Sequence, residues 1–186
     1  MKRINFLIAF ILLSNLAFSQ SQTTTKSGKT SIPTHKGWRN LSWDSTETDV
    51  KQKYGNELTI LQTVGKYGAN GEWYCPFQID NYELGYVNFT VSFLFDEKTK
   101  KLAQINVTKE DPIDMMGTIQ ELEVSLTEKY GKPSIKLETP KYIAKWSFPE
   151  LDIKLSYLDI KSLEKQLYKS IVLTYQKPRK SNLDKF

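Results

Sequence analysis

Side chains that could act as a general base or a nucleophile are scarce in this sequence. It holds one histidine, His35, and one cysteine, Cys75, in 186 residues. A nucleophilic triad needs a histidine or an equivalent base held rigidly beside the nucleophile, and His35 sits in a polar stretch with little to fix it. Neither a phosphate-binding glycine loop nor a dinucleotide fingerprint is present. The sequence therefore predicts no catalytic residue and no cofactor.

Carboxylates are the remaining candidates for chemistry. Glu110, Asp111 and Asp114 lie close together, and such a cluster could bind a hard cation such as Ca²⁺. Capping of a following helix explains Asp111 and Asp114 without a metal. We favour capping, so no metal site is predicted. Two acids distant in sequence could also form the acid pair of a glycoside hydrolase, but the pattern nominates no such pair.

The single cysteine excludes an intramolecular disulfide, so the core alone must hold the fold together. Cys75 alternates with Trp73, Phe77 and Ile79, and this period of two places it among the apolar residues of a strand. We expect a buried, inert thiol. A reactive or intermolecular thiol is the alternative.

Aromatic residues gather between positions 67 and 86. Aromatic side chains beside small polar ones suit the recognition of a protein or a carbohydrate. On alternating strands Tyr74 and Tyr86 would point away from the core, whereas helices covering that face would bury them. The predicted binding residues are Tyr67, Trp73, Tyr74, Tyr82 and Tyr86.

Residues 1–19 have the features of a secretory signal peptide. Lys2 and Arg3 precede an apolar run. The small residues Ala17 and Ser19 occupy the −3 and −1 positions before the expected cleavage site. The run is too short to cross a bilayer, which argues against a retained anchor. We expect export to the periplasm or the extracellular space. A disordered leader over 20–37, rich in Ser, Thr, Lys and Gly, would follow.

The charge balance is only mildly basic. The formal charge of +5 falls by two when the signal peptide is removed. Such a small positive charge does not indicate nucleic-acid binding. No later segment is apolar enough to cross a membrane. We expect a basic tail over 178–186. The C-terminal cations are interpreted as a solvated face and tail: Lys161, Lys165, Lys169, Lys177, Arg179 and Lys180.

One helix is predicted over 112–130. Its apolar residues recur at spacings of three and four, which is typical of a single buried stripe. Asp111 is expected to cap the helix, with Pro112 at its first position and Asp114 in its first turn. Gly131 suits the left-handed residue after the last turn.

A shorter helix is predicted before Gly55. Thr46 and Asp49 form a capping-box pair. The tripeptide Lys-Tyr-Gly ends both helical patterns, 76 positions apart at Gly55 and Gly131. This repetition favours an internal duplication.

Alternating apolar residues predict the strands that follow each helix. We therefore predict an α+β domain over 38–177, made of two similar units over about 38–110 and 111–177. Each unit is a helix followed by an antiparallel sheet of three or four strands, with helices packed on one face. The pattern leaves open whether the two half-sheets join. The predicted strands are 58–64, 73–79, 86–95, 102–108, 134–138, 142–148, 151–158 and 167–175.

The stretch Leu41–Val50 (LSWDSTETDV), with Tyr54 and Gly55, resembles small exported bacterial proteins. It is similar to outer-membrane-assembly lipoproteins of the SmpA/BamE type and to the β-lactamase-inhibitor-protein-like fold. The chain lacks the lipidated cysteine of the lipoproteins. The resemblance implies short helices against an antiparallel sheet and a non-enzymatic, protein-binding role in the envelope. It transfers no catalytic residue.

We therefore expect an exported, non-enzymatic envelope protein that acts as a protein-interaction module. An inhibitor of a secreted or periplasmic enzyme is one alternative. A glycan hydrolase using two carboxylates is another, and a cleft with two facing acids would favour it. The sequence names neither the partner nor the oligomeric state.

Overall fold

The structure is a computed structural model that describes residues 37–138, 142–161 and 166–178. The predicted signal peptide, His35, Lys165, Arg179 and Lys180 lie outside the described residues. So do almost all of the predicted leader and tail.

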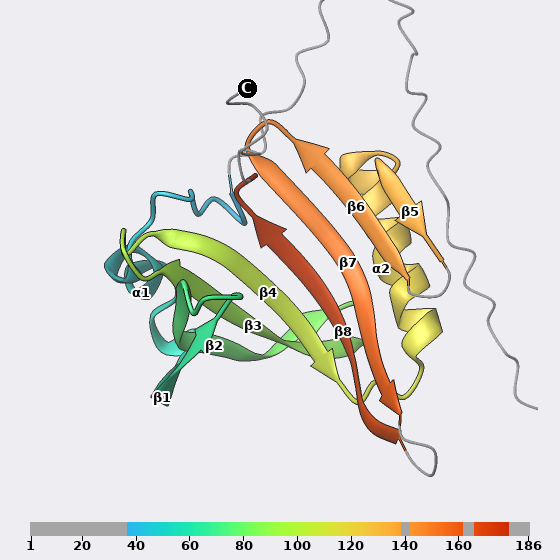
Figure 1. The fold of residues 1–186 in the computed structure, drawn as a ribbon, viewed down its shortest axis with the longest axis horizontal. Coiled ribbons are helices and arrows are strands. Elements are labelled where there is room, and N and C mark those ends of the chain that lie inside the picture. Colours follow the sequence, from blue (N-terminus) through green and yellow to red (C-terminus); the bar gives the residue numbers. More distant parts are fainter. Residues whose placement is uncertain (1–36, 139–141, 162–165, 179–186) are drawn as a thin grey trace, which may run out of the picture. The chain divides into compact units, whose positions relative to one another are not determined.

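Two helices and eight strands make up the described chain (Figure 1). The first helix, α1, spans Glu47–Tyr54 and continues into a 3-10 turn over Gly55–Glu57, and the second, α2, spans Met115–Tyr130. The strands are β1 Leu58–Tyr67, β2 Trp73–Leu84, β3 Val87–Asp96, β4 Leu102–Glu110, β5 Ile135–Leu137, β6 Ile143–Phe148, β7 Leu151–Lys161 and β8 Gln166–Gln176.

All eight strands form one antiparallel sheet in the order β1-β2-β3-β4-β8-β7-β6-β5. The predicted α+β fold, with tandem helix-plus-sheet units over 38–110 and 111–177, is wrong. Of the described residues 54% are in strands and 20% in helices, and they form a single sheet with two short helices.

The junction between β4 and β8 explains why the chain is not two units. Val107 of β4 pairs with Leu173 of β8, and Leu173 pairs on its other side with Leu155 of β7. The last strand of the chain therefore lies inside the sheet. The backbone hydrogen bonds of β4 are completed only by the C-terminal part of the chain.

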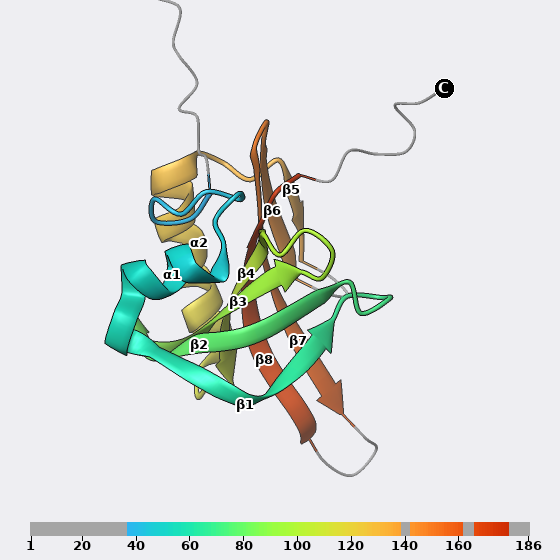
Figure 2. The same cartoon turned by 90° about the vertical axis from the view of Figure 1, so that its left-hand side faces the viewer.

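Both helices lie on the same side of the sheet (Figure 2). Val50 and Tyr54 of α1 join Ile119, Leu122 and Leu126 of α2 in one core cluster with the inward residues of the strands. The opposite side carries no helix among the described residues, and we call it the helix-free face.

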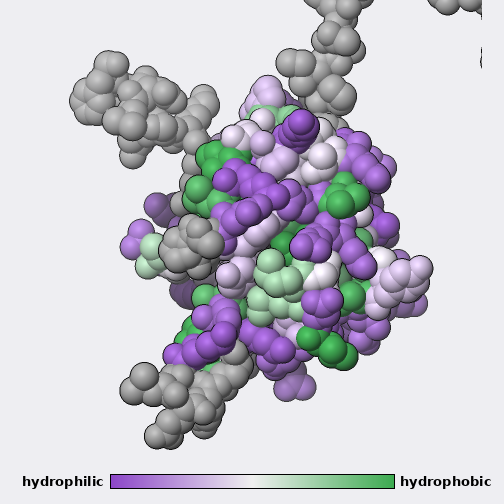
Figure 3. All heavy atoms as spheres, turned by 90° about the vertical axis from the view of Figure 1, so that its right-hand side faces the viewer, coloured by the Kyte–Doolittle hydropathy of each residue, from purple (hydrophilic) through white to green (hydrophobic). Residues whose placement is uncertain are grey.

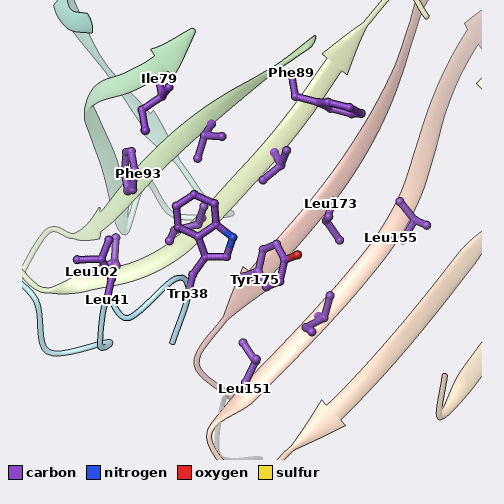
Figure 4. Close-up of a cluster of buried hydrophobic side chains, with 14 of the residues drawn as sticks. Trp38, Leu41, Ile79, Phe89, Phe93, Leu102, Leu151, Leu155, Leu173 and Tyr175 are labelled. Atoms are coloured by element: carbon purple, nitrogen blue, oxygen red, sulfur yellow. The ribbon is translucent and has the colours of Figure 1, made fainter. Parts of the chain in front are cut away.

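Trp38, in the loop before α1, packs where the two halves of the sheet meet. Its ring centroid lies 6.0 Å from that of Phe93 on β3 and 6.3 Å from that of Tyr175 on β8 (Figure 4). Because the same ring contacts both halves, the core is continuous across the molecule.

The ends of the helices follow local sequence chemistry. The capping box of α1 is confirmed, since Thr46 accepts from Asp49 N and Asp49 accepts from Thr46 N. The predicted start of the second helix is wrong. Its cap is Asp114, which accepts from Gly117 N at 2.9 Å. Asp111 adopts a left-handed φ of 43° and donates its N–H to Lys169 O, so it ends β4 instead.

Pro76 produces an irregularity in β2, because proline cannot donate to the ladder. The β1–β2 register shifts between Ile60 and Gly65, and the β2–β3 register shifts between Tyr74 and Gln78. The shift changes which residues of β2 face the helices. Tyr74, Phe77 and Ile79 all belong to the core cluster, and Cys75 does not.

Candidate functional site

The structure does not bring the five predicted aromatic residues together. Tyr74 is only 9% exposed, and its hydroxyl donates to Glu47 Oε1 at 2.7 Å. The prediction that it points outward is wrong, because the bulge at Pro76 turns it towards α1. Burial and the Glu47 hydrogen bond raise the pKa of Tyr74. Tyr74 therefore anchors α1 to the sheet.

Tyr82 is half-buried and packs against the core. Its ring centroid lies 6.0 Å from that of Trp38, and the Arg39 guanidinium sits 5.0 Å from its centre. These contacts indicate that Tyr82 stabilises the core.

Tyr86 points outward, as the alternation indicates, and is 98% exposed. It lies in the turn between β2 and β3, beside α2. Together with Leu84, Gly85, Leu122 and Val124 it lines a hollow of about 470 Å³, which we call the α2 groove.

The α2 groove is apolar at its centre and acidic around it. Val124 of α2 is 58% exposed, whereas Leu122 is covered. Glu121 also lines the groove, and Glu128 lies next to Val124 in an adjoining hollow. The helix carries Glu121, Glu123 and Glu128 against one base, Lys129. An apolar contact ringed by carboxylates is therefore available on this side.

Glu123 is the one acid of α2 that is already engaged. It accepts from Tyr142 Oη at 2.6 Å and pairs with Lys136 Nζ at 2.9 Å. Burial alone would raise the pKa of Glu123, but the hydrogen bonds from Tyr142 and Lys136 outweigh it and lower this pKa. The pair fixes β5 and β6 to the helix.

Hydrophobic side chains on the side shown in Figure 3 form small patches separated by hydrophilic ones. Scattered exposed apolar residues are normal on a soluble surface. A groove such as that beside Tyr86 is a better candidate for a contact, because it combines apolar chemistry with concavity.

Tyr67 and Trp73 border the helix-free face. Tyr67 lines a hollow of about 500 Å³ with Ser92 and Asn106, and Trp73 lines one of about 400 Å³ with Gln104 and Thr174. Tyr67 and Trp73 pair with each other at the end of β2 opposite the turn that holds Tyr86.

Polar side chains of neighbouring strands lie side by side on the helix-free face. The strand register sets Ser92 beside Asn106, Asn106 beside Thr174, and Thr174 beside Lys154. The Asn106 Oδ1 atom accepts from Gln104 Nε2 at 2.8 Å and from Thr174 Oγ1 at 3.2 Å. These hydrogen bonds hold the side chains in fixed orientations.

Two acids, Asp44 and Asp96, line a hollow near the β3–β4 turn, and Glu123 and Glu128 line the hollow beside Val124. Asp96 caps that turn by accepting from the backbone N–H groups of Lys98 and Thr99. The Thr99 backbone hydrogen bond, followed by other contacts in the turn, lowers the pKa of Asp96. An acid held ionised in this way is a poor proton donor for glycoside hydrolysis.

The remaining groups singled out in the sequence are the possible metal ligands and the basic residues. Within the described ranges, no group of three or more His, Cys, Asp or Glu residues could hold a metal ion. Of the predicted basic face, Lys161 pairs with Asp159 at 3.0 Å, and Lys169 Nζ donates to Pro112 O at 2.7 Å.

Cys75 is fully buried, as predicted, but it lies outside the core cluster that contains Phe77 and Ile79. Its Sγ donates to Phe77 O at 3.4 Å, and burial raises the pKa of the thiol. A protonated, covered thiol is a weak nucleophile, so these features favour an inert role.

Comparison with protein-family models, with curated proteins and with solved structures finds no match to this chain. The resemblance to the SmpA/BamE and β-lactamase-inhibitor-protein types therefore stays a prediction. In the part of the chain that the structure describes, no helix has the length and apolar character needed to cross a membrane.

Sequence reasoning missed Leu84, Leu122 and Val124 as companions of Tyr86. The groove forms where a hairpin turn meets a helix more than thirty residues later, and no local pattern encodes that contact. One signal was present: Val124 is an apolar residue outside the buried stripe of the predicted helix.

Proposed function

We propose that this chain is an exported, non-enzymatic module of the bacterial envelope that holds a protein partner in the α2 groove. The observation that carries the proposal is Tyr86, an almost fully exposed aromatic ring beside an apolar hollow. Aromatic anchors that enter or border a pocket supply much of the binding energy at protein interfaces.

The chemistry of the groove defines the partner. An apolar side chain would occupy the space between Tyr86 and Val124, and basic residues beside it would face Glu121 and Glu128. Such a partner segment is amphipathic and cationic. Rim charges chiefly accelerate association and make it sensitive to salt.

Binding is supported better than glycan hydrolysis. Asp44 and Asp96 line one hollow and Glu123 and Glu128 line another. In each pair one acid has a structural role, because Asp96 caps the β3–β4 turn and Glu123 binds Tyr142 and Lys136. The α2 groove needs no assembled catalytic group to act. Inhibition of a secreted enzyme is a special case of the proposal, in which the bound partner is that enzyme.

The test is affinity capture from an envelope extract with the mature chain as bait. We expect a partner that is retained by the wild type, is lost with Tyr86→Ala, and is weakened by raising the salt concentration. Ile60→Ala is the matched control, because Ile60 is also exposed (71%) but lies on β1.

Equal recovery with Tyr86→Ala and the wild type would contradict the proposal. If the captured partner is an enzyme, its activity with and without the chain decides between simple binding and inhibition. Export is tested separately by N-terminal sequencing of the mature protein, with cleavage after Ser19 expected.

A further inference from the structure

The helix-free face offers a second surface that the proposed function does not use. We propose that it binds a neutral, hydroxyl-rich chain, that is, an uncharged glycan. This site and the α2 groove are built from different residues, so each can fail without the other.

The first observation is that the charged residues of this face lie at its margins and leave its centre uncharged. In a chain with 25% charged residues, a solvated sheet face normally carries many of them. Along the described parts of β3, β4 and β8, the charged residues on this face are Asp96 and Glu110, both at strand ends. Lys145, Asp152 and Lys154 of β6 and β7 line one side of the face, where Lys145 pairs with Asp152 at 3.3 Å. The other residues of these strands on this face are Asn88, Thr90, Ser92, Leu94, Gln104, Asn106, Thr108, Tyr168, Ser170, Val172, Thr174 and Gln176.

The second observation is that amides and hydroxyls dominate. Each side-chain amide offers both donors and acceptors, and each hydroxyl can do either. Sugar hydroxyls have the same dual character, so they match this surface without any charge. Charged ligands would gain nothing from the centre of this face.

The hydrogen bonds of the Asn106 side chain leave its amide nitrogen as a donor for a ligand. Asn106 Oδ1 already accepts from Gln104 and Thr174. The Asn106 amide nitrogen has no acceptor among the described residues, so both of its hydrogens are available. Because the oxygen is held by two donors, the nitrogen is oriented before a ligand arrives, which lowers the cost of binding.

The third observation is shape. Two hollows of about 500 and 400 Å³ lie on this face, and the Gln104–Asn106–Thr174 cluster lies between them. Both volumes fall within the range of small-ligand sites. Thr174 is 7% exposed and lines the second hollow, so this part of the face is recessed.

Aromatic rings stand at both hollows. Tyr67 lines the first and Trp73 the second. Each ring combines a large apolar face with a polar edge, and the apolar C–H face of a sugar ring can pack on it while the hydroxyls reach the amides. Two hollows with one ring each suit a chain of several sugar units better than a monosaccharide.

Isothermal titration calorimetry of residues 20–186 tests the inference. The neutral probes are cellohexaose, chitohexaose and maltohexaose, with tetragalacturonate as the charged counterpart and an uncharged Ser/Asn-rich peptide as the other class of chain. We expect binding of at least one neutral oligosaccharide. The charged probe and the peptide should bind at least about tenfold more weakly.

Two variants make the test specific. Asn106→Ala and Thr90→Lys should each weaken binding by about tenfold or more, the first by removing a donor and the second by filling a hollow. Thr48→Lys is the control for Thr90→Lys, because Thr48 is exposed on α1, on the helix side. Tyr86→Ala should bind the oligosaccharide normally.

Three results would overturn the inference: no heat with any neutral oligosaccharide, tighter binding of the peptide, or unchanged binding by both variants. Circular dichroism of each variant establishes that it is folded. Because Tyr86→Ala removes only the groove, loss of the protein partner with retained glycan binding would separate the two proposals.

Discussion

Pro76 determines the environments of its neighbours Tyr74 and Cys75 on β2. Cys75 is buried, as predicted, but the core cluster contains Tyr74 and not Cys75 beside Phe77. Pro76 shifts the register of β2, so Tyr74 and Phe77 both face the helices. The sequence shows the proline, but the size of the shift depends on how β1 and β3 pair around it.

Glu123 gives a pH-dependent prediction at this scale. Its folded pKa lies below the ordinary value of 4.5, so its stabilising effect is complete above that value and is lost as the pH falls through the folded pKa. We expect Glu123→Gln to lower the free energy of unfolding by about 1 kcal/mol at pH 7. The difference should shrink as the pH falls below about 4.5. Urea titrations at pH 7 and pH 3 measure it, and an equal difference at both would contradict the role of the ion pair.

Cys75 gives a prediction about reactivity. Because the thiol is buried and its pKa is raised, a thiol reagent should label the native protein far more slowly than the protein in 6 M guanidinium, a conventional denaturing condition. Time-resolved mass spectrometry measures both rates. Comparable rates would show that Cys75 is accessible.

Secondary-structure elements were the most predictable level. The capping box of α1 and the alternating strands follow from neighbouring residues, and each predicted strand overlaps an observed one. The order of the strands was not predictable in this way. The pairing of β4 with β8 joins segments about seventy residues apart. The repeated tripeptide suggested two similar units and left their junction open.

The packing of α2 can be tested with two substitutions on one helix. Ile119 is fully buried in the core cluster, whereas Val124 is exposed. Ile119→Ala should lower the free energy of unfolding by about 2–5 kcal/mol because it leaves a cavity. Val124→Ala should change it by less than about 0.5 kcal/mol. Chemical denaturation compares them, and similar values would mean that the helix is oriented differently.

The molecule as a whole depends on the closure of the sheet by its last strand. A fragment of residues 37–110 lacks β8, and Ile105 and Val107 of β4 would lose their cross-strand neighbours. We expect this fragment to lack a cooperative thermal transition, whereas residues 37–178 should unfold in one step. Circular dichroism distinguishes them. A cooperative transition in the fragment would contradict this dependence on β8.

At this largest scale the functional surfaces are products of the assembled fold. The α2 groove requires the β2–β3 turn beside the helix, and the helix-free face requires β3, β4 and β8 in register. The sequence indicated aromatic residues that take part in each, namely Tyr86, Tyr67 and Trp73. It could not indicate that they serve different surfaces.

The most direct test of the proposed function is site-specific photocrosslinking in the native envelope. A photoreactive phenylalanine analogue is placed at Tyr86, at Val124 and, as a control, at Ile60, all exposed side chains. We predict a covalent adduct with the same protein from positions 86 and 124 and none from position 60. Absence of an adduct at 86 and 124, or an equal adduct from position 60, would contradict a partner held in the α2 groove.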